Sequence, residues 1–290
     1  MEGVNYFPRS LVFGRNTIFC LAAHPSDPDL AAFGCKLGLV YIVSLRGGGK
    51  VVHRMRGHDE DVYSLAWSPS TSTRLGEEVV EGWLVASASR DRTVRLWSGG
   101  EGRTVHSVRI PSQHKAGGGG KGQGGFAQQS FITVSWPREG SLLTSGGQGE
   151  LVSWDLARPG KKGGSEFTIL HREHFKNLFS IAVCGSVAYT VGQDRSMVAL
   201  ALATARKEFS LATFAGFVYC LAVNPIEPSI LAIGAGDSQI RIWRTGGELL
   251  DIASIHAKLN QGKVTFTLLA RNMISTQELQ FYVVDAMSHN

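Results

Sequence analysis

The sequence has few cysteines, no long apolar run and almost no helical periodicity. The four cysteines stand singly inside apolar segments: Cys20, Cys35, Cys184 and Cys220. This spacing argues against a disulfide framework and a zinc site, and it favours reduced core residues. The longest apolar stretches fall far short of the roughly 20 residues that cross a bilayer. The amino terminus also lacks the basic start and apolar run of a secretory signal peptide. We therefore expect an intracellular protein with no membrane partner.

The composition is that of a globular protein built from short strands. Its 290 residues are 43% hydrophobic and 18% charged, which is enough to bury a sizeable core. The 35 glycines, together with the scarcity of helical periodicity, are typical of many strands joined by turns. A net charge of +5 would favour a polyanion such as RNA without requiring one. The composition thus predicts an all-β fold.

One pattern recurs along the chain. In the clearest copy Gly57-His58 precedes an apolar strand over 62–67, which is followed by a small-residue strand over 84–89 and a third strand that ends in Trp97. These marks resemble those of a WD repeat, in which each unit forms one four-stranded blade of a β-propeller. The register recurs in four weaker copies, whose strands end at Ile42, Trp154, Leu200 and Trp243.

The spacing of these copies locates two insertions. The first two gaps between end positions are 55 and 57 residues, against about 40 to 45 for such repeats. The surplus lies near 70–82 and in the Gly- and Lys-rich stretch 113–125. We therefore predict a propeller segment over 15–270 with about five four-stranded blades in an incomplete ring. A degenerate tail over 271–290 suggests a fragment of a longer product.

His58, Ser87 and Asp91 are the three residue types of a hydrolase triad, but a structural role explains them better. In a WD blade the His before the first strand, the Ser of the second, the Asp of the next turn and the Trp of the third form a hydrogen-bonded tetrad. Here these positions are His58, Ser87, Asp91 and Trp97. Such a network satisfies buried polar groups, and no Gly-x-Ser-x-Gly elbow occurs. We predict no enzyme.

Cofactor and metal motifs are also unconvincing. The stretch 117–122 fits Gly-x-Gly-x-x-Gly, but it lacks the buried strand before it and the helix after it that a dinucleotide site needs. His171 and His174 are spaced too closely for a helical metal-binding pair. We therefore expect no cofactor, no metal and no small-molecule substrate.

Ligands of propellers bind where loops lead into the first strand of each blade. These loops contain two aromatic residues and two cations, which we expect to converge on one face: Arg15, Phe131, Lys176 and Phe217. Aromatic rings at a polar mouth can stack on bases, and cations can hold phosphates. The alternatives without a ligand are that each phenylalanine covers the end of its own blade and that the cations are solvated surface residues.

Several stretches resemble the N-terminal WD region of the fifth Gemin family. They include 16–21, 52–59, 64–67, 215–222 and 230–243, in the same order. The resemblance implies an RNA-binding component of the survival-of-motor-neuron complex that recognises the Sm site and the 7-methylguanosine cap of small nuclear RNA. It also implies residence in the cytoplasm and nucleus.

By position, the resemblance assigns cap stacking to Phe217. It places Phe131 where the family has Trp, and Lys176 where the family has Arg. A Phe offers less stacking area than Trp, and a Lys lacks the two-pronged hydrogen bonding of Arg. The rival hypothesis is a scaffold propeller without RNA binding, whose acidic loop 59–61 suits a basic peptide.

Overall fold

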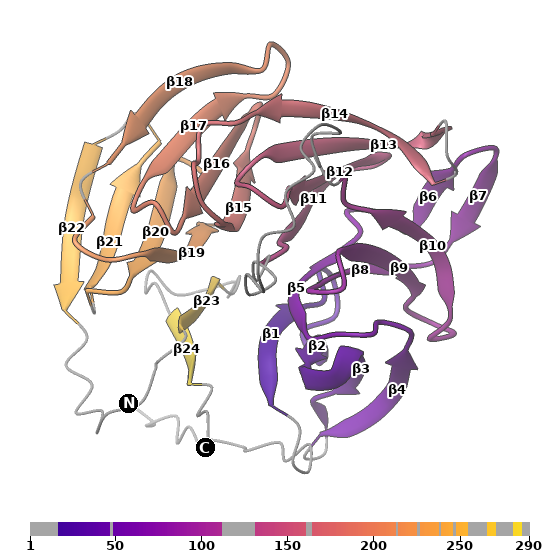
Figure 1. Cartoon of the computed structure of the whole chain (residues 1–290). Helices are drawn as coiled ribbons and strands as arrows, with labels where there is room; N and C mark the ends of the chain where they lie inside the picture. The colour runs from indigo at the N-terminus through magenta and orange to yellow at the C-terminus, as the bar shows by residue number, and fades with distance from the viewer. Residues whose placement is uncertain are drawn as a thin grey trace, which may run out of the picture.

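The computed structural model describes residues 17–46, 49–111, 131–160, 164–212, 214–224, 227–237, 239–245, 248–254, 266–270 and 281–285; beyond residue 245 it describes the backbone alone. Five four-stranded antiparallel sheets follow one another around a ring (Figure 1). The prediction of an all-β propeller with five four-stranded blades is confirmed.

The blades are numbered in chain order. Blade 1 consists of β1 (Ile18–Ala23), β2 (Leu30–Cys35), β3 (Leu39–Ser44) and β4 (Lys50–Arg56). Blade 2 consists of β5 (Val62–Trp67), β8 (Leu84–Ser89), β9 (Thr93–Ser98) and β10 (Thr104–Arg109). Blade 3 consists of β11 (Val134–Arg138), β12 (Ser141–Ser145), β13 (Leu151–Pro159) and β14 (Ser165–His171).

Blade 4 consists of β15 (Leu178–Cys184), β16 (Val187–Gly192), β17 (Met197–Ala201) and β18 (Arg206–Leu211). Blade 5 consists of β19 (Val218–Val223), β20 (Ile230–Ala235), β21 (Gln239–Arg244) and β22 (Glu248–Ser254). The first strand of every blade lies nearest the centre of the ring and the last lies at the periphery (Figure 1).

A two-stranded sheet lies between blade 5 and blade 1. It is formed by β23 (Phe266–Ala270) and β24 (Phe281–Asp285), and β23 contacts β19 of blade 5 and β1 of blade 1. Strand β24 falls within the stretch that the sequence analysis expected to be a degenerate tail.

The core consists of apolar layers between adjacent blades. One layer joins Val40 and Ile42 of blade 1 to Val85 and Trp97 of blade 2. Comparable layers join blades 2 and 3, blades 3 and 4, and blades 4 and 5. Because both faces of a blade are apolar, strands of small and branched residues are favoured over strands that alternate between apolar and polar side chains.

The pairing registers show how the repeat aligns. Trp97 pairs opposite Val85, and Trp154, Leu200 and Trp243 hold the same position in their blades. In blade 1 that position belongs to Val43, which pairs with Ala31. The expected end at Ile42 was therefore wrong by one residue. Blade 1 has no tetrad residues, so its sequence offers no marker from which to align it with the other blades.

The surplus near 70–82 contains a β-hairpin of β6 (Ser72–Leu75) and β7 (Glu78–Glu81). Leu75 and Val80 pack against the apolar layer between blades 2 and 3. The amide of Gly76 donates to the Leu156 carbonyl of blade 3 at 2.8 Å. The hairpin thus bridges two blades. The surplus 113–125 lies outside the described residues.

Gly34 marks a close approach between blades 1 and 2. A Cβ at this position would contact the Cys20 sulfur and lie 2.8 Å from Cγ1 of Val62. We expect Gly34→Ala to lower the free energy of unfolding by about 1–3 kcal/mol because it overpacks this layer. Urea denaturation of the purified chain measures the change.

Gly100→Ala is the matched control, since a Cβ there meets no atom within 4 Å. We expect it to change stability by less than about 0.5 kcal/mol. Equal effects of the two substitutions would contradict the close approach at Gly34.

Candidate functional site

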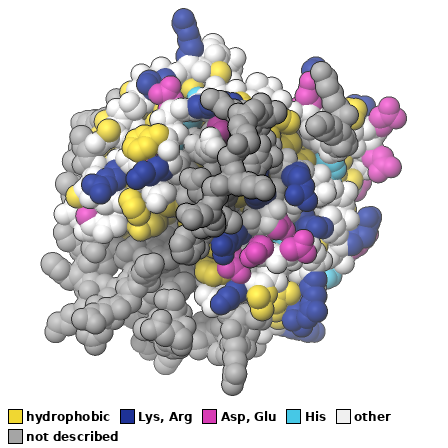
Figure 2. All heavy atoms as spheres, in the orientation of Figure 1, with side chains coloured by type: hydrophobic (Ala, Val, Ile, Leu, Met, Phe, Trp, Pro, Cys, Tyr) yellow, Lys and Arg dark blue, Asp and Glu magenta, His cyan; other side chains and the backbone are white. Residues whose placement is uncertain are grey.

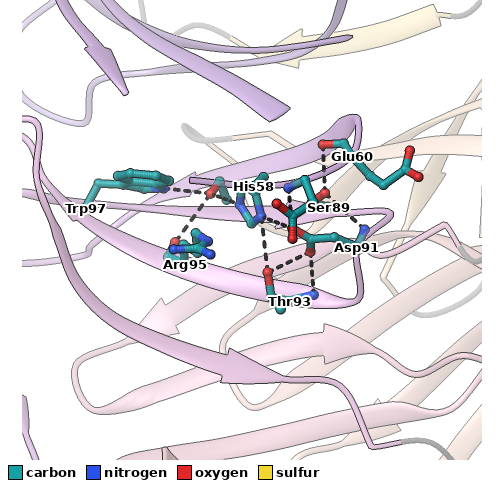
Figure 3. Close-up of polar contacts among 9 residues, drawn as sticks. His58, Glu60, Ser89, Asp91, Thr93, Arg95 and Trp97 are labelled. Carbon is teal, nitrogen blue, oxygen red and sulfur yellow. Dashed lines mark hydrogen bonds and ion pairs between the residues drawn. The ribbon is translucent and has the colours of Figure 1, made fainter. Parts of the chain in front are cut away.

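The structure joins His58, Ser87, Asp91 and Trp97 in one hydrogen-bonded network (Figure 3). Nε2 of His58 lies 2.7 Å from Oγ of Ser87, and Nε1 of Trp97 donates to the same oxygen at 2.7 Å. Nδ1 of His58 lies 2.8 Å from Asp91. The network ties the loop before β5 to the turn between β8 and β9.

This arrangement suits a structural tetrad better than a catalytic triad. Ser87 is fully buried, and its hydroxyl already contacts both the His58 ring and the Trp97 indole. A nucleophile must reach its substrate, and this oxygen has no exposed side.

Electrostatics reinforce the tetrad. Burial by itself would raise the pKa of Asp91, but hydrogen bonds from His58 and Thr93 outweigh it and hold the pKa well below its usual range. The Asp91 carboxylate also accepts hydrogen bonds from the backbone amides of Asp59 and Thr93. The charged form of Asp91 therefore stabilises the folded state.

A second network of this kind, not predicted from the sequence, lies in blade 4. Nε2 of His174 lies 2.9 Å from Oγ1 of Thr190, and Nδ1 lies 3.0 Å from Asp194. His174 precedes its inner strand by four residues, as His58 does. This spacing could have identified the network from the sequence. Blade 4, however, has Leu200 in place of the Trp near the end of the third strand.

Blade 5 replaces the tetrad by different chemistry. Phe214 stands at the position of His58 and Ile233 at that of Ser87. Asp237 instead pairs with Arg241, whose Nη1 lies 3.2 Å from Oδ1. The Arg241 guanidinium lies 5.4 Å from the centre of the Phe214 ring. An ion pair covered by an aromatic ring thus fixes this loop.

Six aromatic residues form a continuous band at the inner strands. Consecutive ring centres are 5.2, 4.7, 5.1, 5.5 and 6.2 Å apart along the series Phe19, Tyr63, Phe131, Phe179, Tyr219 and Phe217. The series takes rings from all five blades, and all six residues are half-buried. The structure therefore brings Phe131 and Phe217 into one band, together with four rings that the sequence analysis did not select.

Four of these rings lie at irregularities in strand pairing. The register shifts on either side of Phe19, Tyr63, Phe179 and Tyr219, each of which is left without a pairing partner. Such bulges redirect a side chain out of the regular alternation. The signal in the sequence was an aromatic at the second residue of these four inner strands.

Charged groups lie beside one ring of the band, Tyr63. Arg90 contacts the Tyr63 hydroxyl, while burial and, after it, the charge of Asp61 raise the pKa of Tyr63. Lys176 is exposed, and its Nζ lies 5.8 Å from the centre of the Phe175 ring. Arg15 lies outside the described residues. On the face shown in Figure 2, basic and acidic side chains are interspersed.

Within the described residues no cluster of three His, Cys, Asp or Glu side chains is arranged to hold a metal ion. The four cysteines are free thiols, and burial raises the pKa of Cys35 to about 12. No helix in the described part of the chain is long and apolar enough to span a membrane.

Comparisons with known proteins agree with the blade geometry. The family "WD domain, G-beta repeat" matches residues 49–98. A solved structure, the β-propeller domain of Cps50 (Swd1) from Myceliophteria thermophila, superposes with a TM-score of 0.59 at 15% identity, covering 93% of this chain and 71% of that one. This chain is a WD-repeat β-propeller protein.

The sequence relatives are more specific. The chain is 30% identical to Gem-associated protein 5 of Mus musculus and of Homo sapiens over 79% of its own length. It is 24% identical to Component of gems protein 5 of Dictyostelium discoideum over 82% of its length. The resemblance to the WD region of the fifth Gemin family is confirmed. The chain spans 17% of the length of the mouse and human relatives and 23% of the Dictyostelium one.

The tetrad predicts a pH dependence of stability. Because the pKa of Asp91 is lowered in the folded state, its stabilising effect is present above its unfolded pKa of about 3.9 and is lost as pH falls below that value. We expect Asp91→Asn to cost about 1.5–3 kcal/mol of unfolding free energy at neutral pH, the range for hydrogen bonds to charged groups. This deficit should shrink as pH falls below about 4. Urea denaturation across that range measures it.

Glu101→Gln serves as the control, since the Glu101 side chain forms an exposed ion pair with Arg103. It should alter stability by less than about 0.5 kcal/mol at neutral pH. If Asp91→Asn lowers the free energy of unfolding by the same amount at neutral and at low pH, the charge of the Asp91 carboxylate contributes nothing to stability.

Proposed function

We propose that the chain binds RNA as a WD-repeat component of the survival-of-motor-neuron complex, with the aromatic band as its contact surface. Small nuclear RNA is the proposed ligand, recognised through its Sm site and 7-methylguanosine cap in the cytoplasm and nucleus. Proteins of that complex are the proposed partners. The relatives named Gem-associated protein 5 support the assignment.

The aromatic band is the observation that carries this proposal. Half-buried rings at the inner strands of all five blades offer stacking surfaces in a row. Unpaired bases stack on such rings whatever their identity, at about 1–3 kcal/mol per base. A band of rings therefore suits an extended single strand better than a compact small molecule.

Phe131 and Phe217 have defined roles in this proposal. Phe131 links the rings of Tyr63 and Phe179, and Phe217 ends the series beside Tyr219. In the proposal both stack on bases, Phe217 on the cap. Lys176 supplies a phosphate contact, and Arg15 supplies a second.

A protein scaffold is the second candidate. Asp59 and Glu60 are exposed on the loop that leads into β5, which carries Tyr63. This acidic tip would attract a basic peptide. Peptide capture that RNA does not compete with would favour this function.

Fluorescence anisotropy with capped small nuclear RNA tests the proposal. We expect the folded chain to bind with a steep salt dependence. Phe131→Ala and Phe217→Ala should each weaken binding by about 5- to 150-fold, the equivalent of about 1–3 kcal/mol. Cap analogue should compete, and Phe217→Ala should lose that competition.

Phe167→Ala is the matched control, because Phe167 is an aromatic residue of the peripheral strand β14 and 43% exposed. It should leave RNA binding unchanged. Failure of the wild-type chain to bind RNA at low salt, with circular dichroism confirming its fold, would overturn the proposal.

A further inference from the structure

The loop that leads into β15 carries an exposed aromatic residue beside an exposed cation. Phe175 is 76% exposed, more than any other large hydrophobic side chain that the structure describes. Lys176 follows it and is exposed too, with Nζ 5.8 Å from the ring centre. We call these two residues the blade-4 tip.

The tip lies between two anchored residues. His174 is 2% exposed and is held by Thr190 and Asp194. On the other side, Nδ2 of Asn177 donates to Oε1 of Gln193 at 3.2 Å, and the Gln193 amide donates to the Asn177 carbonyl at 2.9 Å. Because the tip is already fixed at both ends, the protein loses less conformational entropy when a ligand binds there.

The fold does not require an aromatic residue at this position. The equivalent tip in blade 2, after His58, is Asp59–Glu60, and in blade 5, after Phe214, it is Ala215–Gly216. All three loops lead into inner strands of the same blade architecture. Packing therefore does not explain Phe175, and its exposure confirms that it contributes little to the core.

The tip belongs to the same blade as Phe179, one ring of the aromatic band. Phe175 precedes Phe179 of the band by four residues, and both belong to the same inner strand and its leading loop. Blade 4 presents a cation at its tip, whereas blade 2 presents two carboxylates at the equivalent tip. Phosphates are therefore favoured over blade 4 and disfavoured over blade 2.

We infer that the blade-4 tip is an outer nucleotide site of the RNA surface. Phe175 stacks on one base of a single strand beyond those on the band, and Lys176 contacts a phosphate next to that base. The RNA strand consequently leaves the band over blade 4. This inference rests on the proposed RNA-binding function.

Single-stranded uridine-rich RNA of decreasing length is the probe, measured by fluorescence anisotropy with the full chain. Phe175→Ala should weaken binding of the longer RNAs by about five- to tenfold, the lower part of the range for base stacking. Phe175→Trp should bind at least as tightly as the wild type, because the larger ring offers more stacking area. Lys176→Ala should reduce the slope of log affinity against log salt by about 0.7.

RNA length separates stacking from a general loss of folding. Once the RNA is too short to reach the tip, wild type and Phe175→Ala should bind equally. Phe167→Ala and Lys50→Ala are the controls on peripheral strands, and neither should change the length dependence.

Two outcomes are distinguishable. If the wild type binds RNA and Phe131→Ala weakens it, but Phe175→Ala behaves like Phe167→Ala at every length, the outer site is overturned and the proposed function stands. If the folded wild type binds no RNA, both the proposed function and the outer site are overturned. The same holds if it binds only a basic peptide and RNA does not compete with that peptide.

Discussion

Packing between neighbouring blades is the constraint on which the rest of this structure depends. A four-stranded sheet with two apolar faces cannot bury them by itself, so each blade is stable only against the next. The apolar layers between consecutive blades meet this requirement for both faces of blades 2, 3 and 4 and for one face each of blades 1 and 5. Glycine at 34 and 234 lets backbones approach a cysteine sulfur in blades 1 and 5. Packing of consecutive blades holds the inner strands close enough for rings from different blades to touch.

The loops at the inner strands are fixed by polar groups that differ from blade to blade. Blade 2 uses a full tetrad, blade 4 uses the same arrangement without the Trp, and blade 5 uses the pair of Asp237 and Arg241 under Phe214. These networks hold the loops through buried residues and leave the tips free to vary. The same scaffold therefore presents carboxylates on one blade, and an aromatic ring with a cation on another.

The aromatic band arises where regular strand pairing fails. At Phe19, Tyr63, Phe179 and Tyr219 the register shifts by one residue, so the ring leaves the interblade layer that its neighbours occupy. Val62 and Val218, which precede two of these rings, are fully buried. A single unpaired residue thus moves a side chain from the core to a half-buried position, and its repetition in four blades brings the rings into a row.

The sequence by itself determined the repeat, the four-stranded blades and the tetrad of blade 2, because those features depend on residue types at short, regular spacing. It also identified Phe131 and Phe217 as aromatic residues of the leading loops. The tertiary structure alone decided the register of blade 1, where no tetrad side chain fixes Val43, and the role of His174, whose partners lie 16 and 20 residues away. It alone revealed the band, since strict alternation assigns Tyr63 and Phe179 to the core. A bulge is a property of strand pairing, and contacts between rings of different blades exist only once the blades have packed around the ring.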